Sequence, residues 1–260
     1  MVIAVEELQG FVGKRIVEVT GNSRQPKERL VGEVIRDIFS YGKYLNFQFD
    51  DFALRIHFML FGSLRVGEPR PNRDPRLTIS VGQEQQLLTT PSGRHVHQDH
   101  DAQPLPTAYF YACSVKFVED GNLRAAYDFR TDIMSPQWDR TYVMKQVRAL
   151  PPTTTVDDVL MDQQIFTGVG NIIKNEVLWR LKMAPSTRLA DLTPRQIGRL
   201  VTDARAYSQR FYELKKQYIL RKNYQIYRKG ACPRGCESKI IHRKTGKRER
   251  MSHWCPVCQK

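Results

Sequence analysis

The sequence predicts an α+β protein with an N-terminal antiparallel β-sandwich, a helical middle domain and a C-terminal β-hairpin that holds a zinc ion. Three observations support this prediction. The first 130 residues alternate apolar and polar side chains, the following stretch has helical periodicity, and four of the five cysteines fall near the C-terminal end. We therefore expect domains at residues 1–130, 131–221 and 222–260.

The strands of the sandwich are predicted from apolar residues at every second position. The pattern is clearest in residues 45–49, 54–58 and 77–81. Antiparallel strands with one apolar face build sandwiches, because each sheet must cover that face against another layer. A short helix around residues 3–8 is expected to precede them.

The helices are predicted from apolar residues at helical spacing in residues 138–150, 171–181 and 193–216. Pro151-Pro152 ends the first of these segments. The remainder, from about residue 222, is short and basic, and such a segment cannot form a stable core without a metal ion.

Positive charge is concentrated at the C-terminal end of the chain. The formal net charge is +14, and residues 205–260 contain 16 lysines and arginines against three acids, which leaves 25 against 24 in the rest. A basic block beside a neutral one indicates a polyanionic partner, although a solvated, solubilising surface has the same composition. No apolar run approaches the ~20 residues that a membrane span needs, and no secretory signal is recognisable. We expect a cytoplasmic protein, nucleoid-associated if bacterial, with no membrane partner.

Four cysteines form the strongest motif. Cys232 and Cys236 are followed, after 18 residues, by Cys255 and Cys258. Two pairs of thiolates at this spacing fit one tetrahedral Zn²⁺, and four thiolates close its coordination sphere, so the ion is expected to be structural. The fifth, Cys113, is expected to be a small buried residue.

A polar segment at residues 92–106 contains three histidines, His95, His97 and His100. A solvated loop is the favoured interpretation, because no predicted helix or strand would fix these side chains around a metal. We assign no function to this segment.

A second motif lies at residues 162–180. Gly168 and Gly170 precede a helix that is expected to begin near Asn171. Glycines allow close approach of the backbone to a ligand, and free N–H groups at a helix N-terminus favour a phosphate. Taken alone, this short motif is equally typical of a tight turn between helices.

Together, these motifs resemble the formamidopyrimidine/endonuclease VIII family of DNA glycosylases. The glycine-containing motif is similar to the helix–two-turn–helix of that family, and residues 226–230 with Arg250 are similar to its zinc finger. Residues 41–43 and 57–63 are similar to its N-terminal domain. Details of these motifs favour the endonuclease VIII-like 2 branch, which has a histidine in place of Cys236.

The resemblance implies a set of site residues and a partner. Damaged DNA would lie between the sandwich and the helical domain, with the damaged nucleotide flipped out of the stack. Met59, Leu60 and Phe61 would fill the vacated space, although apolar residues at a strand end are more often core. Asn171 and Arg250 would bind the flanking phosphates. Lys43 would contact phosphate and assist strand cleavage. The alternative interpretation is that Lys43 is a solvent-exposed lysine in a turn.

Members of the family begin with a proline nucleophile followed by a glutamate. The secondary amine of this proline attacks the sugar and forms a Schiff base. The printed chain begins Met1-Val2-Ile3, as if entered partway along the family's first helix. Three explanations for the missing proline and glutamate are open: a misassigned start, a truncation, or an inactive descendant that only binds DNA. The first is favoured because Lys43, Asn171 and Arg250 persist.

Three functions compete at this point. The leading one is a monomeric base-excision repair glycosylase with apurinic/apyrimidinic lyase activity on oxidised bases. Lys43 and Arg250 would be its catalytic residues in the printed chain, and one structural Zn²⁺ its metal. The second is a non-catalytic damage-binding protein of the same fold. The third, a zinc-ribbon transcription or RNA-binding protein, does not account for Lys43 or the Met59–Phe61 segment. Neither the preferred lesion nor the choice of duplex, bubble or single-stranded substrate can be predicted.

Overall fold

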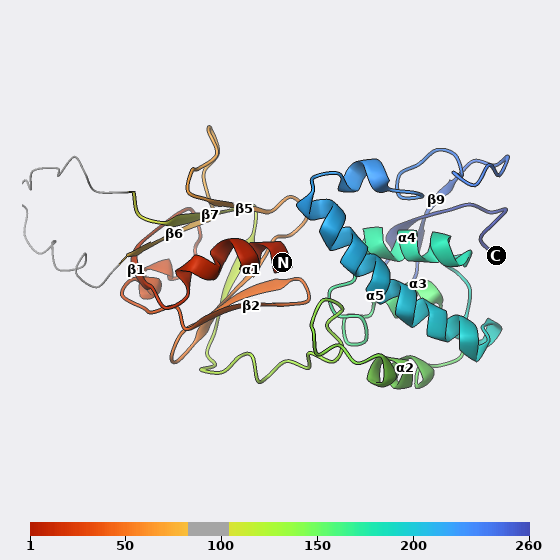
Figure 1. The fold of residues 1–260 in the computed structure, drawn as a ribbon, viewed down its shortest axis with the longest axis horizontal. Helices are drawn as coiled ribbons and strands as arrows, with labels where there is room; N and C mark the ends of the chain where they lie inside the picture. Colours follow the sequence, from red (N-terminus) through yellow and green to blue (C-terminus); the bar gives the residue numbers. More distant parts are fainter. Residues whose placement is uncertain (83–103) are drawn as a thin grey trace, which may run out of the picture. The chain divides into compact units, whose positions relative to one another are not determined.

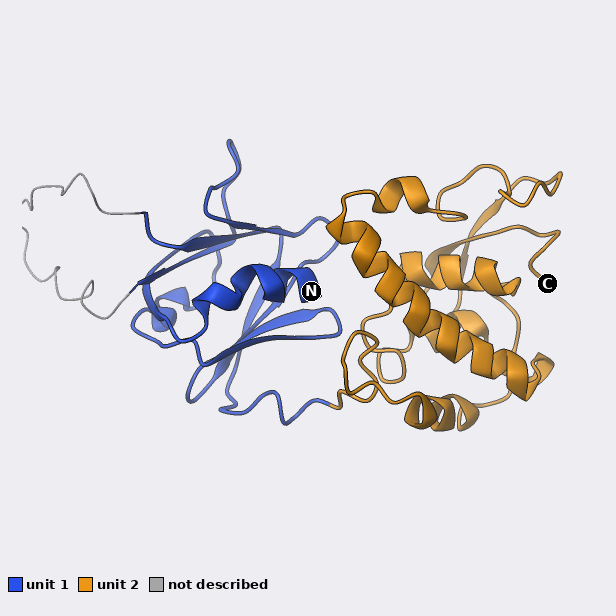
Figure 2. Ribbon diagram, viewed as in Figure 1, with its two compact units in different colours: residues 1–127 blue, residues 128–260 orange. Residues whose placement is uncertain are grey.

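The computed structural model describes residues 1–82 and 104–260, which form two compact units (Figures 1 and 2). Unit 1 comprises residues 1–127 and unit 2 comprises residues 128–260. The three histidines of the polar segment lie outside the described residues. A separate domain beginning near residue 222 stays a prediction.

Unit 1 contains two four-stranded antiparallel sheets, ordered β1-β6-β7-β5 and β2-β3-β4-β8. The strands are β1 (Arg15–Thr20), β2 (Asp37–Tyr41), β3 (Tyr44–Gln48), β4 (Ala53–His57), β5 (Ser63–Val66), β6 (Leu77–Gly82), β7 (Thr107–Tyr111) and β8 (Ser114–Val118). Buried residues of both sheets form one core, in which the rings of Phe47 and Phe110 meet edge to face at 6.0 Å. Helix α1 (Val2–Leu8) buries Ala4 and Leu8 in the same core. The predicted sandwich and its leading helix are confirmed.

Strand β3 departs from the predicted half-buried pattern. Its polar residues Asn46 and Gln48 are buried as fully as its apolar ones. The amide of Gln48 donates to the carbonyl oxygens of Phe49, Phe52 and Asp120 and accepts from the N–H of Leu123. The segment after β8 therefore covers this face, and the amide side chain satisfies backbone groups that burial would otherwise leave unpaired.

Unit 2 contains four α-helices and a β-hairpin. The elements are α2 (Arg140–Arg148), α3 (Val156–Met161), α4 (Asn171–Leu181), α5 (Pro194–Lys216), β9 (Ile241–Thr245) and β10 (Arg250–Trp254). The three predicted helices are confirmed, with shorter ends for the first, whereas α3 was not predicted because one and a half turns give too little periodicity.

Side-chain caps set most of these helix starts. Asp139, Thr155 and Thr193 cap α2, α3 and α5 by accepting first-turn N–H groups. Helix α4 differs, since its N-cap is Gly170 and no side chain caps its first turn.

Short 3₁₀ helices connect several of these elements, among them η1 (Gln9–Phe11), η2 (Lys27–Leu30), η4 (Leu189–Asp191) and η5 (Leu220–Asn223). None of the helices in the described part of the chain combines the length and apolar composition needed to cross a bilayer.

Candidate nucleic-acid interface and metal centre

The four predicted metal ligands come together at the end of unit 2. The Sγ atoms of Cys232, Cys236, Cys255 and Cys258 all lie within 4.8 Å of one another, and those of Cys232 and Cys258 are 3.7 Å apart. Zn–S bonds of about 2.3 Å in a tetrahedron place sulfurs about 3.8 Å apart. The cluster therefore fits one Zn²⁺ with no open position, which makes the ion structural. Cys113 is buried elsewhere, and burial raises the pKa of its thiol to about 11.

The zinc-binding segment has little apolar core of its own. Its buried apolar side chains are Ile226 and Ile240 with two of the cysteines, and Trp179 of α4 packs against them. The carboxylate of Glu176, itself fully buried, accepts the backbone N–H groups of residues 225–227. Helix α4 thus anchors the chain at the point where it enters the metal centre.

The start of α4 lies against the start of β10. The Asn171 side chain donates to the carbonyl oxygen of Met251 over 2.9 Å, although 80 residues separate them. The neighbouring Arg250 is exposed and has no ion pair among the described residues. Gly168, at φ +99°, and Gly170 lead into the uncapped first turn, whose N–H groups are suited to a phosphate. Unit 2 therefore joins two of the predicted phosphate-binding residues on one surface.

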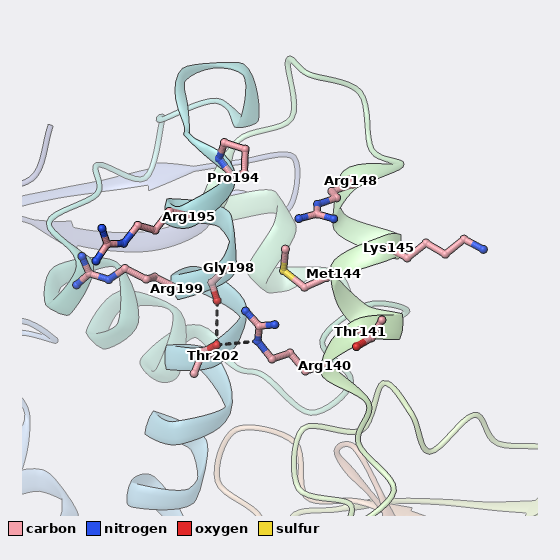
Figure 3. A pocket seen from close by; sticks show the side chains of 10 residues that line it. All are labelled: Arg140, Thr141, Met144, Lys145, Arg148, Pro194, Arg195, Gly198, Arg199 and Thr202. Atoms are coloured by element: carbon pink, nitrogen blue, oxygen red, sulfur yellow. Dashed lines mark hydrogen bonds between the residues drawn. The ribbon is translucent and has the colours of Figure 1, made fainter.

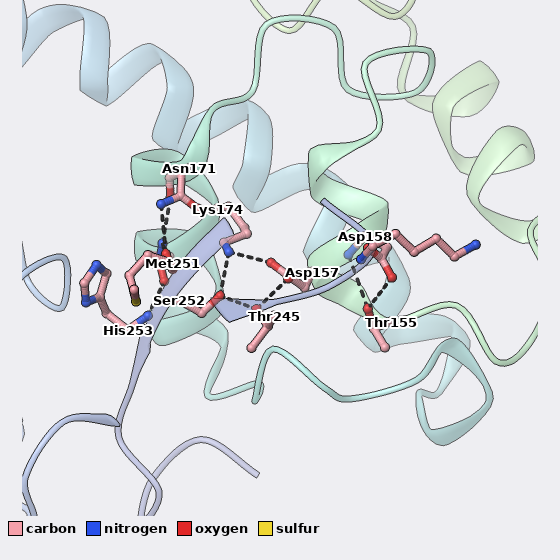
Figure 4. A network of polar contacts seen from close by, with 11 residues as sticks. Thr155, Asp157, Asp158, Asn171, Lys174, Thr245, Met251, Ser252 and His253 are labelled. Carbon is pink, nitrogen blue, oxygen red and sulfur yellow. Dashed lines mark hydrogen bonds and ion pairs between the residues drawn. The ribbon is translucent and has the colours of Figure 1, made fainter. Parts of the chain in front are cut away.

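A buried ion pair holds this surface together (Figure 4). Lys174 of α4 and Asp157 of α3 are 0% and 2% exposed, and their charged atoms lie 2.6 Å apart. Lys174 Nζ also donates to Ser252 Oγ of β10, and Thr245 Oγ1 of β9 donates to Asp157 Oδ2. Two helices and both strands of the hairpin therefore meet at one pair of charges.

The turn between β9 and β10 is also hydrogen-bonded to α3. The N–H of Lys247 donates to Asp158 Oδ1, and Gly246 adopts φ +68°. A Cβ at Gly246 would lie 2.5 Å from Asp157 Oδ2, so a larger residue would have to displace this carboxylate and would be strained at the positive φ. Burial lowers the pKa of Lys174, Asp157 raises it, and the charge of Arg250 adds to the lowering. The sequence motif did not reveal this network; the one available signal was three consecutive polar residues, 174–176, inside an otherwise apolar helix.

Unit 1 carries the other predicted site residues. Met59, Leu60 and Phe61 lie in the turn between β4 and β5 and are 64%, 78% and 75% exposed, so they are not core residues. Met59 has φ +33°, and its N–H donates to His57 Nδ1 over 3.0 Å. The turn is tight, since a Cβ at Gly62 would lie 2.5 Å from the carbonyl oxygen of Phe58. A tight turn thus presents three large apolar side chains to solvent.

Lys43 lies nearby, in the two-residue turn that joins β2 to β3, where Gly42 adopts φ +56°. Burial and, second, the charge of Lys43 lower the pKa of His57. A neutral His57 keeps an acceptor nitrogen for the Met59 N–H, so the same environment that shifts the pKa preserves the turn. Lys43 and the apolar turn are therefore neighbours in unit 1.

Known proteins resemble this chain in sequence. Residues 3–96 match the formamidopyrimidine-DNA glycosylase N-terminal domain, and residues 131–221 match the formamidopyrimidine-DNA glycosylase H2TH domain. The chain is 28% identical over 246 residues to endonuclease 8-like 3 of Xenopus laevis, covering 94% of this chain and 38% of that protein. It is 26% identical over 272 residues to endonuclease 8-like L720 of Acanthamoeba polyphaga mimivirus, covering 99% and 97% of the two.

A solved structure shows the same fold. Lactococcus lactis formamidopyrimidine-DNA glycosylase, bound non-covalently to DNA containing an AP site, superposes with a TM-score of 0.75 at 22% identity, over 99% of this chain and 96% of that one. The two-sheet unit, the helical unit and the four-cysteine hairpin define the formamidopyrimidine-DNA glycosylase fold. The chain belongs to the formamidopyrimidine-DNA glycosylase/endonuclease VIII family. Assignment to the endonuclease VIII-like 2 branch stays a prediction.

Proposed function

We propose that this chain is a DNA glycosylase with apurinic/apyrimidinic lyase activity that acts on oxidised bases in damaged DNA. The observation that carries the proposal is the surface of unit 2 where the uncapped start of α4 and Asn171 adjoin the exposed Arg250. A guanidinium and free backbone N–H groups are the donors that bind phosphates. A flipped nucleotide needs its two flanking phosphates held in this way.

The other predicted residues fit the same reaction. Met59, Leu60 and Phe61 would enter the space left by the flipped base, which offsets part of the lost stacking. Lys43 would contact a phosphate and assist strand cleavage, and the four cysteines would hold one structural Zn²⁺ that fixes the hairpin bearing Arg250. We expect the chain to act as a monomer.

Reductive trapping tests the proposal. The chain would be incubated with abasic-site DNA and borohydride, and a covalent protein–DNA adduct would be sought on a denaturing gel. A Schiff base is reduced to a stable amine, so an adduct is expected if an amine of Met1, Val2 or Lys43 attacks the sugar. Arg250→Ala should lower the adduct yield about tenfold or more, since a charge-assisted contact is lost. The matched control is Arg248→Ala, another exposed arginine of the same hairpin.

The other outcomes separate the competing functions. Preferential binding of abasic-site DNA with no adduct would replace the lyase by a non-catalytic damage-binding protein. Equal binding of abasic and intact duplex, with no adduct, would contradict both.

A further inference from the structure

A second basic surface lies between α2 and the first half of α5. It is a groove of about 590 Å³, whose lining includes Arg140, Lys145 and Arg148 from α2 and Arg195, Gly198 and Arg199 from α5 (Figure 3). We call it the α2–α5 groove. None of its lining residues belongs to the surface formed by Asn171 and Arg250.

The positive charge of the groove is not neutralised by neighbouring acids. No Asp or Glu lines it, and its arginines and lysine form no ion pair within the described ranges 1–82 and 104–260. The acids next to it in sequence are engaged elsewhere. Asp139 caps the first turn of α2, Asp191 pairs with Arg188, and Asp203 pairs with Arg180.

The placement of the charges is unfavourable for the isolated helices. Arg140 is the first residue of α2 and Arg195 the second of α5, and neither first turn contains an acid. A cation at a helix N-terminus opposes the helix dipole, which the N-cap carboxylate of Asp139 offsets in α2 but no acid of the first turn offsets in α5. Arg195 and Arg199 also repel each other at a spacing of four residues. A bound anion would offset both effects.

One guanidinium is already positioned for such an anion. Arg140 Nε donates to Thr202 Oγ1 over 3.1 Å, and that hydroxyl donates to the carbonyl oxygen of Gly198 over 2.9 Å. A Cβ on Gly198 would lie 3.2 Å from Arg140 Nη2, so the glycine lets the guanidinium approach α5 closely. The two terminal nitrogens of Arg140 make no hydrogen bond to any described residue and remain available to a ligand.

Figure 3 shows how the other cations are arranged around it. Arg140 and Arg148 extend from α2 into the space beside α5, whereas Arg195 and Arg199 leave α5 on the opposite side and Lys145 points away from it. Arg140 and Arg148 are eight residues apart, which corresponds to about 12 Å along a helix. Two cations therefore face the space between the helices, and three more lie on the outer sides of α2 and α5.

We propose that the α2–α5 groove binds the phosphodiester backbone of a nucleic acid. Protein partners bind through buried aromatic and apolar anchors, but the large exposed apolar side chains of the described residues include none of the groove. The same lack of aromatic groups excludes base stacking as a main contribution, so binding is independent of sequence. The inference concerns nucleic-acid affinity and does not depend on the lesion chemistry.

The salt dependence of binding tests this site. The affinity of the full chain for a fluorescein-labelled undamaged duplex would be measured by anisotropy at several KCl concentrations. The variant R140Q/R148Q/R195Q removes the two cations that face the groove and one beside it without touching Asn171 or Arg250. Its affinity is expected to fall about tenfold or more, and the slope of log K against log[KCl] to decrease by about 2–3.

A matched control removes the same charge elsewhere. The substitutions K14Q/R24Q/R73Q alter three exposed side chains of unit 1 and should leave the salt slope within about one unit of the wild type. Equal slopes for the two triple variants would overturn the proposal. The proposal would also be overturned if the triple substitution in the groove abolished binding of a labelled polyglutamate peptide and left the duplex affinity unchanged. Thermal unfolding checks that the variants fold, and the borohydride adduct yield at saturating DNA should not change.

Discussion

Two charged side chains of unit 2 are buried, and the burial of a charge costs free energy. The Lys174–Asp157 pair is almost fully removed from solvent, and each partner also bonds to a hydroxyl of the hairpin. Desolvating two charges offsets much of their attraction, so such a pair adds little net stability. Removing one partner lowers the stability strongly, because the other charge is then buried without a counter-charge.

We therefore predict strong, non-additive effects on stability at this pair. Lys174→Met should lower the free energy of unfolding by about 3–5 kcal/mol, because Asp157 is left without its cation. The double variant D157N/K174M should be no less stable than either single variant, since it leaves no unpaired charge. Urea denaturation measures all four proteins, and additive losses would show that the two side chains do not interact.

At the scale of an element, the β4–β5 turn is tight, but its exposed residues contribute little to the core. Its Met59, Leu60 and Phe61 side chains are mostly exposed, whereas Gly62 and His57 fix the backbone beneath them. Exposed positions seldom change stability by more than about 0.5 kcal/mol. Function and folding can thus be separated in this turn.

Replacing the three residues by serine should weaken binding of abasic-site DNA by about tenfold or more, because apolar contact with unstacked bases is lost. Affinity for intact duplex and the thermal midpoint should stay nearly constant. Val31 and Val66, which are 44% and 41% exposed, provide a matched double variant to serine. Equal losses for abasic and intact DNA would exclude the turn from lesion binding.

At the scale of the whole molecule, the metal centre stabilises one unit and not the other. The zinc-binding segment has few buried apolar residues, whereas unit 1 has an extensive core of its own. Metal binding to such small segments supplies much of their folding free energy.

Removal of zinc by a chelator should therefore unfold the hairpin and weaken DNA binding about tenfold or more, while the sheets of unit 1 persist. The expected signature is an early change in the fluorescence of Trp179 and Trp254, separate from a later main transition. Zinc content and DNA affinity would be measured on the same samples, and restored zinc should restore both. Undiminished affinity of the metal-free chain would contradict this role.

How much of the structure could be predicted from the sequence depends on how local each feature is. Period-2 and helical patterns identified β3, β4, β6, α4 and α5, because a side chain's direction follows from its own backbone. The spacing of the four cysteines predicted the metal centre for a similar reason, since each pair forms one short turn. The motif around Asn171 was found from its glycines, whereas the role of Asn171 and the Met59–Phe61 turn were found through resemblance, and these roles stay predictions.

Tertiary structure alone decided which polar groups are buried and what they contact. Gln48 belongs to an alternating strand, yet it is buried by a segment 72 residues away. Lys174 would be assigned to solvent by composition, but it meets Asp157 and a strand 78 residues further on. The α2–α5 groove likewise forms only where two helices meet, and the charges of each helix taken alone would be assigned to solvent. The sequence determined the elements with a clear period, the four-cysteine cluster and the family, because these depend on neighbours along the chain. The fold decided the buried charges and the groove, because burial and electrostatic partners depend on neighbours in space.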